Sequence, residues 1–428
     1  MKAYKSLSRE ELESLQQELL KAYEDAKAKG LNLDMSRGKP SISQLDMVMD
    51  ILDVLNSGSE VKSENGMDCR NYGLFDGIPE VKRLMAQSVG VKEEHVIVCG
   101  NSSLNLMYDA VSRSVTHGVC GGTPWCKLDK VKFLCPVPGY DRHFAVTEHF
   151  GIEMINIPMT IQGPDMDLVE KYVNEDASVK GIWCVPKYSN PQGISYSDET
   201  VRRFAGLKPA AEDFRIYWDN AYAIHHLYED KQDEILDIIS ECEKAGNPDM
   251  VYEFFSTSKV SFAGGGIAGL ASSPRNLDDI RKSMVIQTIG FDKVIQLRHV
   301  RYYKDLDGLK AQMRKHADIV RPKFEAVLAV LERELGGLEI GSWIRPRGGY
   351  FISFDAMEGC AKEIVAKCKD AGVVMTGAGA TFPYGKDPRD SNIRIAPSFP
   401  TPEEMEAATD LFVLCVKLVS VNKLLETM

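Results

Sequence analysis

The stretch Met250-Val251-Tyr252-Glu253-Phe254-Phe255-Ser256-Thr257-Ser258-Lys259 joins an apolar run to a lysine that stands among small hydroxyl residues. A short apolar run is typical of a buried strand, so we expect Lys259 just past its carboxyl end, where open α/β sheets bind their ligands. A lysine amine becomes a nucleophile when burial or a nearby cation lowers its pKa. Because most lysines are solvated surface charges, this interpretation depends on what the rest of the chain places beside Lys259.

The composition excludes several classes of protein. The chain has 428 residues, 44% of them hydrophobic, which is enough for a large core and two unequal domains. A formal net charge of −11 and the lack of basic runs argue against nucleic acid or an anionic membrane as the main partner. Ten cysteines are scattered singly, as in reduced proteins. The charged start lacks the apolar core of a signal peptide, so we expect a cytoplasmic protein that acts on small molecules.

A second predicted strand end carries hydroxyl groups. His95 to Cys99 is an apolar run, and Gly100-Asn101-Ser102-Ser103 separates it from a stretch of helical spacing that starts at Leu104. Free backbone N–H groups and two hydroxyls at a helix start can bind an anion such as a phosphate, although serine is also an ordinary helix cap. Ser102 and Ser103 are therefore candidate phosphate ligands.

Three more predicted strand ends carry distinctive side chains. Tyr140 follows the run Val131 to Cys135, and an aromatic ring in that place can stack on a planar ligand. Asn190 follows the run Gly181 to Val185 within Asn-Pro-Gln-Gly, which is foremost a turn. Asp219 ends the run Arg215 to Asp219, where a carboxylate needs a cation or several donors as partners. Tyr222 completes an Asp-x-x-Tyr motif with it.

The remaining pattern predicts the domain organisation. Helical spacing predicts helices over residues 8–29, with a capping box at Ser8 and Glu11, and over 45–55, 81–88, 309–335 with a kink at Pro322, 358–371 and 402–425. Strands are expected over 152–157, 267–272, 348–354 and 392–396, the last of which contains Arg394. We expect an α/β fold: a large domain (residues 51–310) with a mostly parallel central sheet flanked by helices, and a smaller α+β domain (residues 311–428) joined by an N-terminal segment (residues 1–50).

The candidate residues all fall at the same edge of one predicted sheet. They are Ser102, Ser103, Tyr140, Asn190, Asp219, Tyr222, Ser256 and Lys259. This set matches the needs of pyridoxal 5'-phosphate: serine hydroxyls for the phosphate, a lysine for the Schiff base, and an aromatic ring to stack on the pyridine. Asp219 would keep the pyridine nitrogen protonated, while Asn190 and Tyr222 would hydrogen-bond the ring hydroxyl.

The chain resembles the class I/II aminotransferase family of fold-type-I pyridoxal phosphate enzymes, most closely its aspartate aminotransferase branch. The resemblance covers nearly the whole length. It is carried by Ser36-Arg37-Gly38-Lys39-Pro40, Tyr72 with Gly77, Asn190-Pro191-Gln192-Gly193, Asp219 with Tyr222, Ser256-x-Ser258-Lys259 and Asn392-Ile393-Arg394.

The resemblance implies a role for each matching residue. Lys259 would hold the cofactor and later move the substrate proton, and Arg394 would clamp the substrate α-carboxylate in a bidentate fork. Gly38 would let the backbone approach that carboxylate. Tyr72 would reach the cofactor phosphate of a neighbouring subunit, which implies a homodimer with its sites at the interface.

The chain departs from the family pattern at two positions. The family usually has a phosphate-binding arginine eight residues after the lysine, and here that residue is Ile267. Another cation must then compensate the phosphate charge, and Lys293, Arg298 and Arg301 are unranked candidates. Tyr140 stands where the best-known members have tryptophan, which preserves a planar face.

We expect a transaminase that moves an amino group from an L-amino acid, aspartate first, to a 2-oxo acid such as 2-oxoglutarate by a ping-pong mechanism. A second substrate carboxylate needs another cation, for which Arg37, Arg142 and Arg347 are available; we favour Arg37 because it adjoins Gly38. The alternatives are a lyase or decarboxylase on the same fold, an aminotransferase for a different amino acid, and a regulator fused to a DNA-binding module, for which the N-terminal segment is too short.

Two other motifs carry little weight. Gly264 to Gly269 fits G-x-G-x-x-G, but a dinucleotide site needs a strand directly before it and a helix directly after it. His225-His226 and the pair His143 and His149 lack a third ligand at useful spacing, so we expect no metal.

Overall fold

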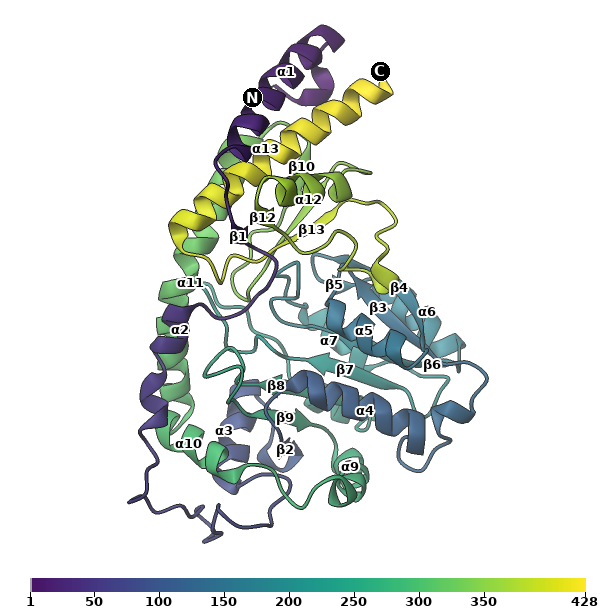
Figure 1. Ribbon diagram of the computed structural model, residues 1–428. Coiled ribbons are helices and arrows are strands. Elements are labelled where there is room, and N and C mark those ends of the chain that lie inside the picture. Colours follow the sequence, from purple (N-terminus) through teal and green to yellow (C-terminus); the bar gives the residue numbers. More distant parts are fainter. Residues whose placement is uncertain (1) are drawn as a thin grey trace.

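The structure is a computed structural model that describes residues 2–428, and its centre is an eight-stranded sheet with helices on both faces (Figure 1). The strands lie in the order β2-β9-β8-β7-β6-β3-β4-β5. Neighbours from β8 to β4 pair in parallel, whereas β9 pairs antiparallel with both β8 and β2, and β5 antiparallel with β4. The predicted α/β fold with a mostly parallel central sheet is confirmed.

The strands of this sheet are β2 (Val96–Val98), β3 (Lys132–Val137), β4 (Glu153–Thr160), β5 (Gly163–Pro164), β6 (Val179–Cys184), β7 (Arg215–Asp219), β8 (Val251–Ser256) and β9 (Ala268–Ala271). The helices around it are α3 (Pro79–Val89), α4 (Ser103–His117), α5 (Asp141–His149), α6 (Met166–Glu175), α7 (Asp198–Ala205), α8 (Ile238–Lys244), α9 (Pro274–Gln287) and α10 (Lys293–Tyr303). Because β9 follows the glycine-rich segment, the strand predicted there is confirmed and the dinucleotide-binding arrangement does not form.

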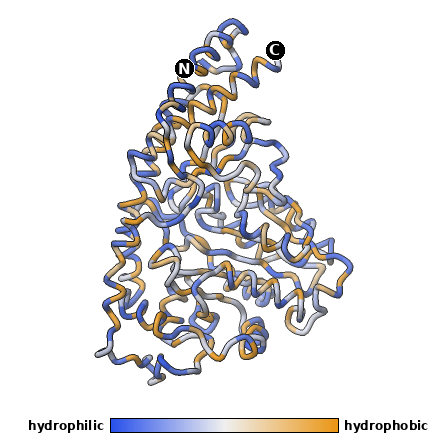
Figure 2. The backbone as a smooth tube through the Cα atoms, in the orientation of Figure 1, coloured by the Kyte–Doolittle hydropathy of each residue, from blue (hydrophilic) through white to orange (hydrophobic). Residues whose placement is uncertain are grey.

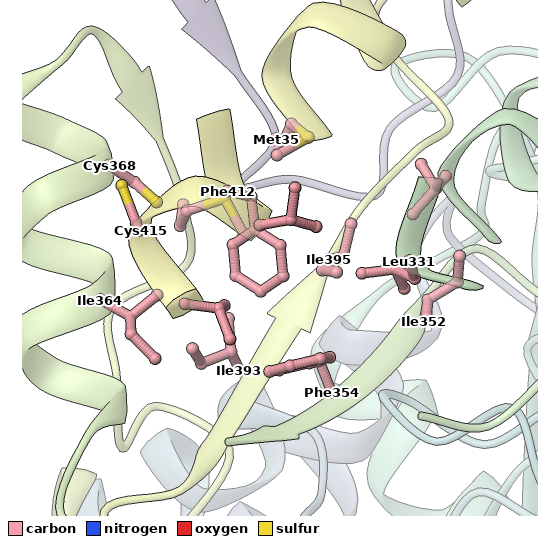
Figure 3. Packing of buried hydrophobic residues seen from close by; sticks show 14 of the residues in the cluster. Met35, Leu331, Ile352, Phe354, Ile364, Cys368, Ile393, Ile395, Phe412 and Cys415 are labelled. Carbon is pink, nitrogen blue, oxygen red and sulfur yellow. The ribbon is translucent and has the colours of Figure 1, made fainter. Parts of the chain in front are cut away.

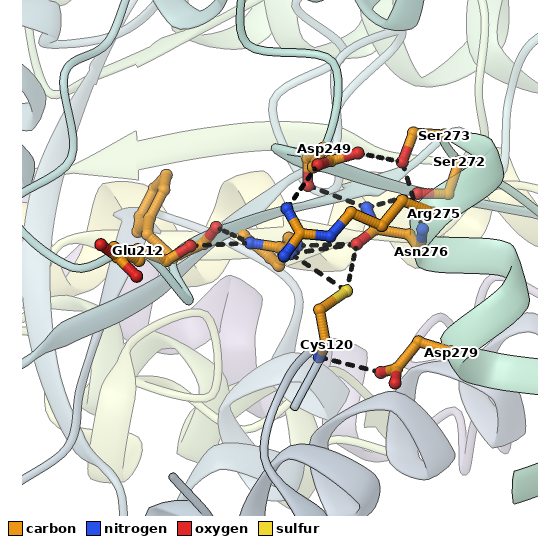
Figure 4. Close-up of polar contacts among 10 residues, drawn as sticks. Cys120, Glu212, Asp249, Ser272, Ser273, Arg275, Asn276 and Asp279 are labelled. Carbon is orange, nitrogen blue, oxygen red and sulfur yellow. Dashed lines mark hydrogen bonds and ion pairs between the residues drawn. The ribbon is translucent and has the colours of Figure 1, made fainter. Parts of the chain in front are cut away.

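Strand β7 is anchored at its amino end. All five of its residues are buried, and its first residue, Arg215, donates two hydrogen bonds to Asn276 Oδ1, 3.2 and 3.0 Å long. Asn276 in turn donates to the Asp249 carbonyl, while the Cys120 N–H donates to Asp279 (Figure 4). This network fixes the start of the strand whose last residue is Asp219.

A second group of elements lies beyond the carboxyl edge of the large sheet. Its strands are β1 (Leu33–Asp34), β10 (Gly341–Trp343), β11 (Ile352–Ala356), β12 (Val373–Val374) and β13 (Asn392–Ile395), in a three-stranded antiparallel sheet β10-β11-β13 and a parallel pair β1-β12. Its helices are α1 (Arg9–Lys27), α2 (Ile42–Asp46), α11 (Leu306–Leu335), α12 (Ala361–Asp370) and α13 (Pro402–Thr427). The capping box predicted at Ser8 and Glu11 is present, and α11 continues past Pro322.

These elements share one hydrophobic core. Figure 3 shows Phe412 of α13 among Leu331 of α11, Phe354 of β11 and Ile393 of β13. Leu12 and Leu19 of α1 belong to the same cluster, so the two ends of the chain are packed together.

Two predicted elements differ from the structure. The single helix over 45–55 is wrong: Ser41 starts α2 earlier, α2 ends at Asp46, and a separate 3-10 turn covers Met49–Leu52. Asp46, Asp50 and Asp53 recur at helical spacing, which favours one helix, but Val48, with a φ of −108° and a ψ of 10°, leaves the helical conformation between the two turns. The strand expected from Gly348 begins at Ile352, because Gly348 and Gly349 turn closely around Tyr188 and Gly349 has a φ of +78°.

Hydrophobic and hydrophilic positions alternate along the chain (Figure 2). Among residues 2–428, no helix combines the length and the apolar character that crossing a membrane requires.

Candidate active site

The predicted strand-end residues line one cavity at the carboxyl edge of the large sheet. The cavity has a volume of about 650 Å³. Its lining includes all of the predicted site residues except Tyr72: Arg37, Gly38, Ser102, Ser103, Tyr140, Asn190, Asp219, Tyr222, Ser256, Lys259 and Arg394. Residues separated by more than 300 positions in the sequence therefore meet in one place.

Asp219 lines this cavity at the end of β7. Its side chain is buried, and its Oδ2 accepts a hydrogen bond of 2.9 Å from His143 Nε2 on α5. The His143 ring is itself stacked on Trp183, with centroids 4.5 Å apart. Asp219 Oδ1 is also buried but has no hydrogen-bond partner within residues 2–428. A buried carboxylate oxygen without a donor is costly, and the protonated nitrogen of a pyridine ring would supply the missing N–H.

Lys259 lies past the end of β8, as the sequence predicts. Its Nζ is 5.1 Å from the ring centroid of Tyr222 and 5.8 Å from that of Tyr350. Burial lowers the pKa of the Lys259 amine, and the nearby Asp219 carboxylate opposes that shift. A lowered pKa increases the fraction of free amine, which is the form that attacks a carbonyl carbon or accepts a proton.

A cradle of hydroxyls lies beside Lys259. Ser102 precedes the first residue of α4, and Ser103 is that residue, so the free N–H groups of the helix start face the cavity. Ser256 Oγ donates to Ser258 Oγ over 3.0 Å, which joins the two serines of the Ser-x-Ser-Lys motif. These donors suit a phosphate group, and together with Asp219 and Lys259 they fit pyridoxal phosphate.

The cradle lacks the usual arginine. Ile267 is fully buried in the apolar core, and its N–H donates to Thr257 Oγ1 over 2.9 Å. None of the three candidate substitutes, Lys293, Arg298 and Arg301, lines the cavity. The cation that lines both this cavity and the adjoining one next to Ser102 is Arg142, which the sequence suggested for another role.

Arg394 lies on β13 and lines the same cavity. Its side chain is only 7% exposed, and its guanidinium carbon is 4.7 Å from the centroid of the Phe351 ring. Arg394 donates to Asp141 on α5, to Asn190 in the loop after β6 and to Thr376 just after β12, so it connects β13 to these three segments. These bonds hold the guanidinium in a fixed orientation at the wall of the cavity.

The three arginines considered as ligands of a second substrate carboxylate differ in their position relative to the cavity. Arg37 and Arg142 are exposed side chains that line the cavity. Arg347 lies outside it and pairs with Asp233 at 3.2 Å. Arg347 is thus removed from the candidates, while Arg37 and Arg142 both remain.

Tyr72 is the one predicted site residue outside the cavity. Its side chain is 73% exposed, on the loop before α3. A residue that serves the site of a second subunit would be exposed in this way in a single chain.

Three residues with a place in the site were not predicted. His143 was considered only as a metal ligand; its position three residues after Tyr140, one helical turn into α5, is the signal that could have placed it in the site. Ser258 was part of the lysine motif but received no role. Asp141 directly follows Tyr140, and no sequence pattern pairs it with Arg394, which lies far along the chain.

Comparison with known proteins agrees with this geometry. The sequence model of the family described as aspartate amino-transferase matches residues 7–428. An aspartate aminotransferase of Corynebacterium glutamicum is 43% identical over 405 residues, which cover 94% of this chain and 93% of that protein. The crystal structure of an aspartate transaminase from the same species has a TM-score of 0.96 and 41% identity, with 99% of each chain covered.

A more distant relative shares the fold. The α-aminoadipate aminotransferase of Thermus thermophilus, solved in complex with N-(5'-phosphopyridoxyl)-L-leucine, has a TM-score of 0.71 and 19% identity, with 95% of this chain and 96% of that chain covered.

Proposed function

This chain belongs to the aspartate amino-transferase family and is an aminotransferase, and from this we propose that it transfers the amino group of L-aspartate to 2-oxoglutarate with pyridoxal phosphate as cofactor. The observation that carries the proposal is the buried Asp219 Oδ1, which has no donor among residues 2–428 and lies in the cavity that Lys259 also lines.

Different residues of the cavity bind different parts of the cofactor. Ser102, Ser103, Ser256 and the N-terminus of α4 bind the phosphate, and Tyr140 covers the ring. Asp219, oriented by His143, holds the proton on the pyridine nitrogen. Bound pyridoxal phosphate supplies an electrophilic carbon for the amino group and an electron sink for the Cα–H bond.

The proton transfer is assigned to Lys259. Its Nζ accepts the proton from the substrate Cα, and burial favours this because it keeps part of the amine uncharged. Tyr222 and Asn190, both buried, hold the ring hydroxyl in place. The closed apolar surroundings of Tyr222 and Tyr350 limit the access of water.

Two arginines bind the two carboxylates of the substrate. Arg394 binds the α-carboxylate that amino acid and oxo acid share, with Gly38 beside it. Arg37 binds the second carboxylate of aspartate and of 2-oxoglutarate. Two separated carboxylates distinguish these substrates from alanine and pyruvate.

We also propose the larger arrangement. The chain forms a homodimer in which Tyr72 of each subunit completes the site of the other, which is in keeping with its exposure. The elements divide into a large domain of residues 51–310 and a small one of 311–428 with the segment 1–50. The protein acts in the cytoplasm on amino acids and 2-oxo acids, without nucleic acid, membrane or metal.

The test is the visible absorbance of the purified holoenzyme during addition of L-aspartate. The band of the bound cofactor should move to that of its amine form and return when 2-oxoglutarate is added. Lys259→Ala should keep the fold, checked by circular dichroism, and lose transamination. Retained turnover in that variant would refute the mechanism, and release of ammonia or pyruvate without any oxo acid would indicate a lyase.

A further inference from the structure

The hydrogen bonds of Arg394 leave no free face for a substrate. A guanidinium has five N–H donors, and a carboxylate binds in a bidentate manner either to Nη1 with Nη2 or to Nε with Nη2. Arg394 Nε donates to Thr376 Oγ1 over 3.3 Å, and Nη1 donates both to Asp141 Oδ1 over 2.9 Å and to Asn190 Oδ1 over 3.2 Å. Within residues 2–428, only Nη2 has no partner, so each bidentate face contains a donor already in use.

Asp141 differs from the other two acceptors because it is charged. Thr376 and Asn190 are neutral, and their bonds are the longer ones. Of the residues that line the cavity, only Asp141 and Asp219 are carboxylates, and Asp219 is bound by His143. The Asp141 side chain is 34% exposed, so it can turn toward water when another anion takes its place.

We propose that Asp141 is an internal competitor that occupies the α-carboxylate position of Arg394 in the free enzyme and is displaced by the substrate. This inference rests on the proposed function, because it assumes that Arg394 binds the substrate α-carboxylate. Every ligand that uses Arg394 must overcome the same ion pair. A small anion with one carboxylate is therefore held weakly, whereas a dicarboxylate gains a second contact elsewhere in the cavity.

The test measures binding rather than turnover. Succinate is added to the holoenzyme in a calorimeter, with the wild type, Asp141→Asn, Glu148→Gln and Arg394→Ala compared. Asp141→Asn replaces a charged acceptor with a neutral one and should tighten succinate binding about 3- to 10-fold. Glu148 is exposed on the same helix, α5, and Glu148→Gln makes the same change in net charge away from Arg394, so it should change the affinity less than about twofold.

Steady-state kinetics give a second measurement. The KM values of aspartate and of 2-oxoglutarate should both fall by the factor seen for succinate, with kcat changed by less than about twofold, because both substrates carry the α-carboxylate. A role for Asp141 in merely orienting Arg394 predicts the opposite sign, a weaker affinity and a higher KM.

The outcomes separate the two proposals. If succinate binds through Arg394 but Asp141→Asn leaves its affinity unchanged or weaker, the competitor role is wrong and the proposed function stands. If succinate fails to bind the wild type, or binds Arg394→Ala equally well, both the competitor role and the assignment of the α-carboxylate site are wrong.

Discussion

Replacing Gly38 with alanine should damage substrate binding through Phe351. A Cβ atom at Gly38 would lie 2.4 Å from Phe351 Cζ and 2.7 Å from Cε1, whereas ordinary contacts are 3.4–4 Å. The ring must therefore move by about 1 Å, and it is only 5% exposed, so it has little room. Because the guanidinium of Arg394 lies against this ring at 4.7 Å, the displacement reaches the substrate site directly.

The magnitude follows from the cost of overpacking. Inserting a methyl group into a closed contact costs about 1–3 kcal/mol, which corresponds to about 5- to 150-fold in kcat/KM if the whole cost appears in substrate binding. We expect a decrease of about 10- to 100-fold, mainly through a higher KM for the amino acid.

The assay is steady-state transamination with aspartate, together with the thermal unfolding midpoint. Gly264→Ala is the matched control, because a Cβ atom there meets nothing within 4 Å. If Gly38→Ala leaves kcat/KM unchanged, or lowers the unfolding midpoint but leaves KM normal, then the idea that Phe351 positions Arg394 is wrong.

Two further predictions concern charge. Burial raises the pKa of Glu253, in the middle of β8, from an ordinary value of 4.5 to about 8. Between these pH values the folded protein binds one more proton than the unfolded chain, so its stability falls as the pH rises from about 4.5 to about 8. Glu253→Gln should flatten that decline in a series of unfolding midpoints from acid to alkaline pH; an unchanged slope would contradict it. Arg37→Ala should lower kcat/KM about tenfold more for aspartate than for alanine, and an equal loss for both would exclude Arg37 as the second cation.

The strand ends of the site were predictable from local sequence. Asp219 ends one apolar run and Lys259 closely follows another, and parallel strands bring such ends to one edge of the sheet. The departure at Ile267 was also visible, and the structure explains it, because that side chain points into the core instead of the cavity.

Other features depended on contacts that no local pattern encodes. His143 meets Asp219 only because α5 packs against the large sheet, where it contacts β4, and Asp141 meets Arg394 only because α5 and β13 come together in the fold. The same holds for Arg347, which looked equivalent to Arg37 in the sequence but is paired with Asp233 away from the cavity. The sequence shows that these side chains are polar, but only the tertiary packing determines which partners they bind.

The shared core of α1 and α13 has a consequence for biosynthesis. Leu12 and Leu19 are synthesised roughly 400 residues before Phe412 and Val416, which belong to the same cluster. At about 5 to 20 residues per second, roughly 20 to 80 s separate the synthesis of these two groups of side chains. Over that interval the apolar side chains of α1 lack the helix that buries them in the folded protein, which leaves them open to non-native contacts.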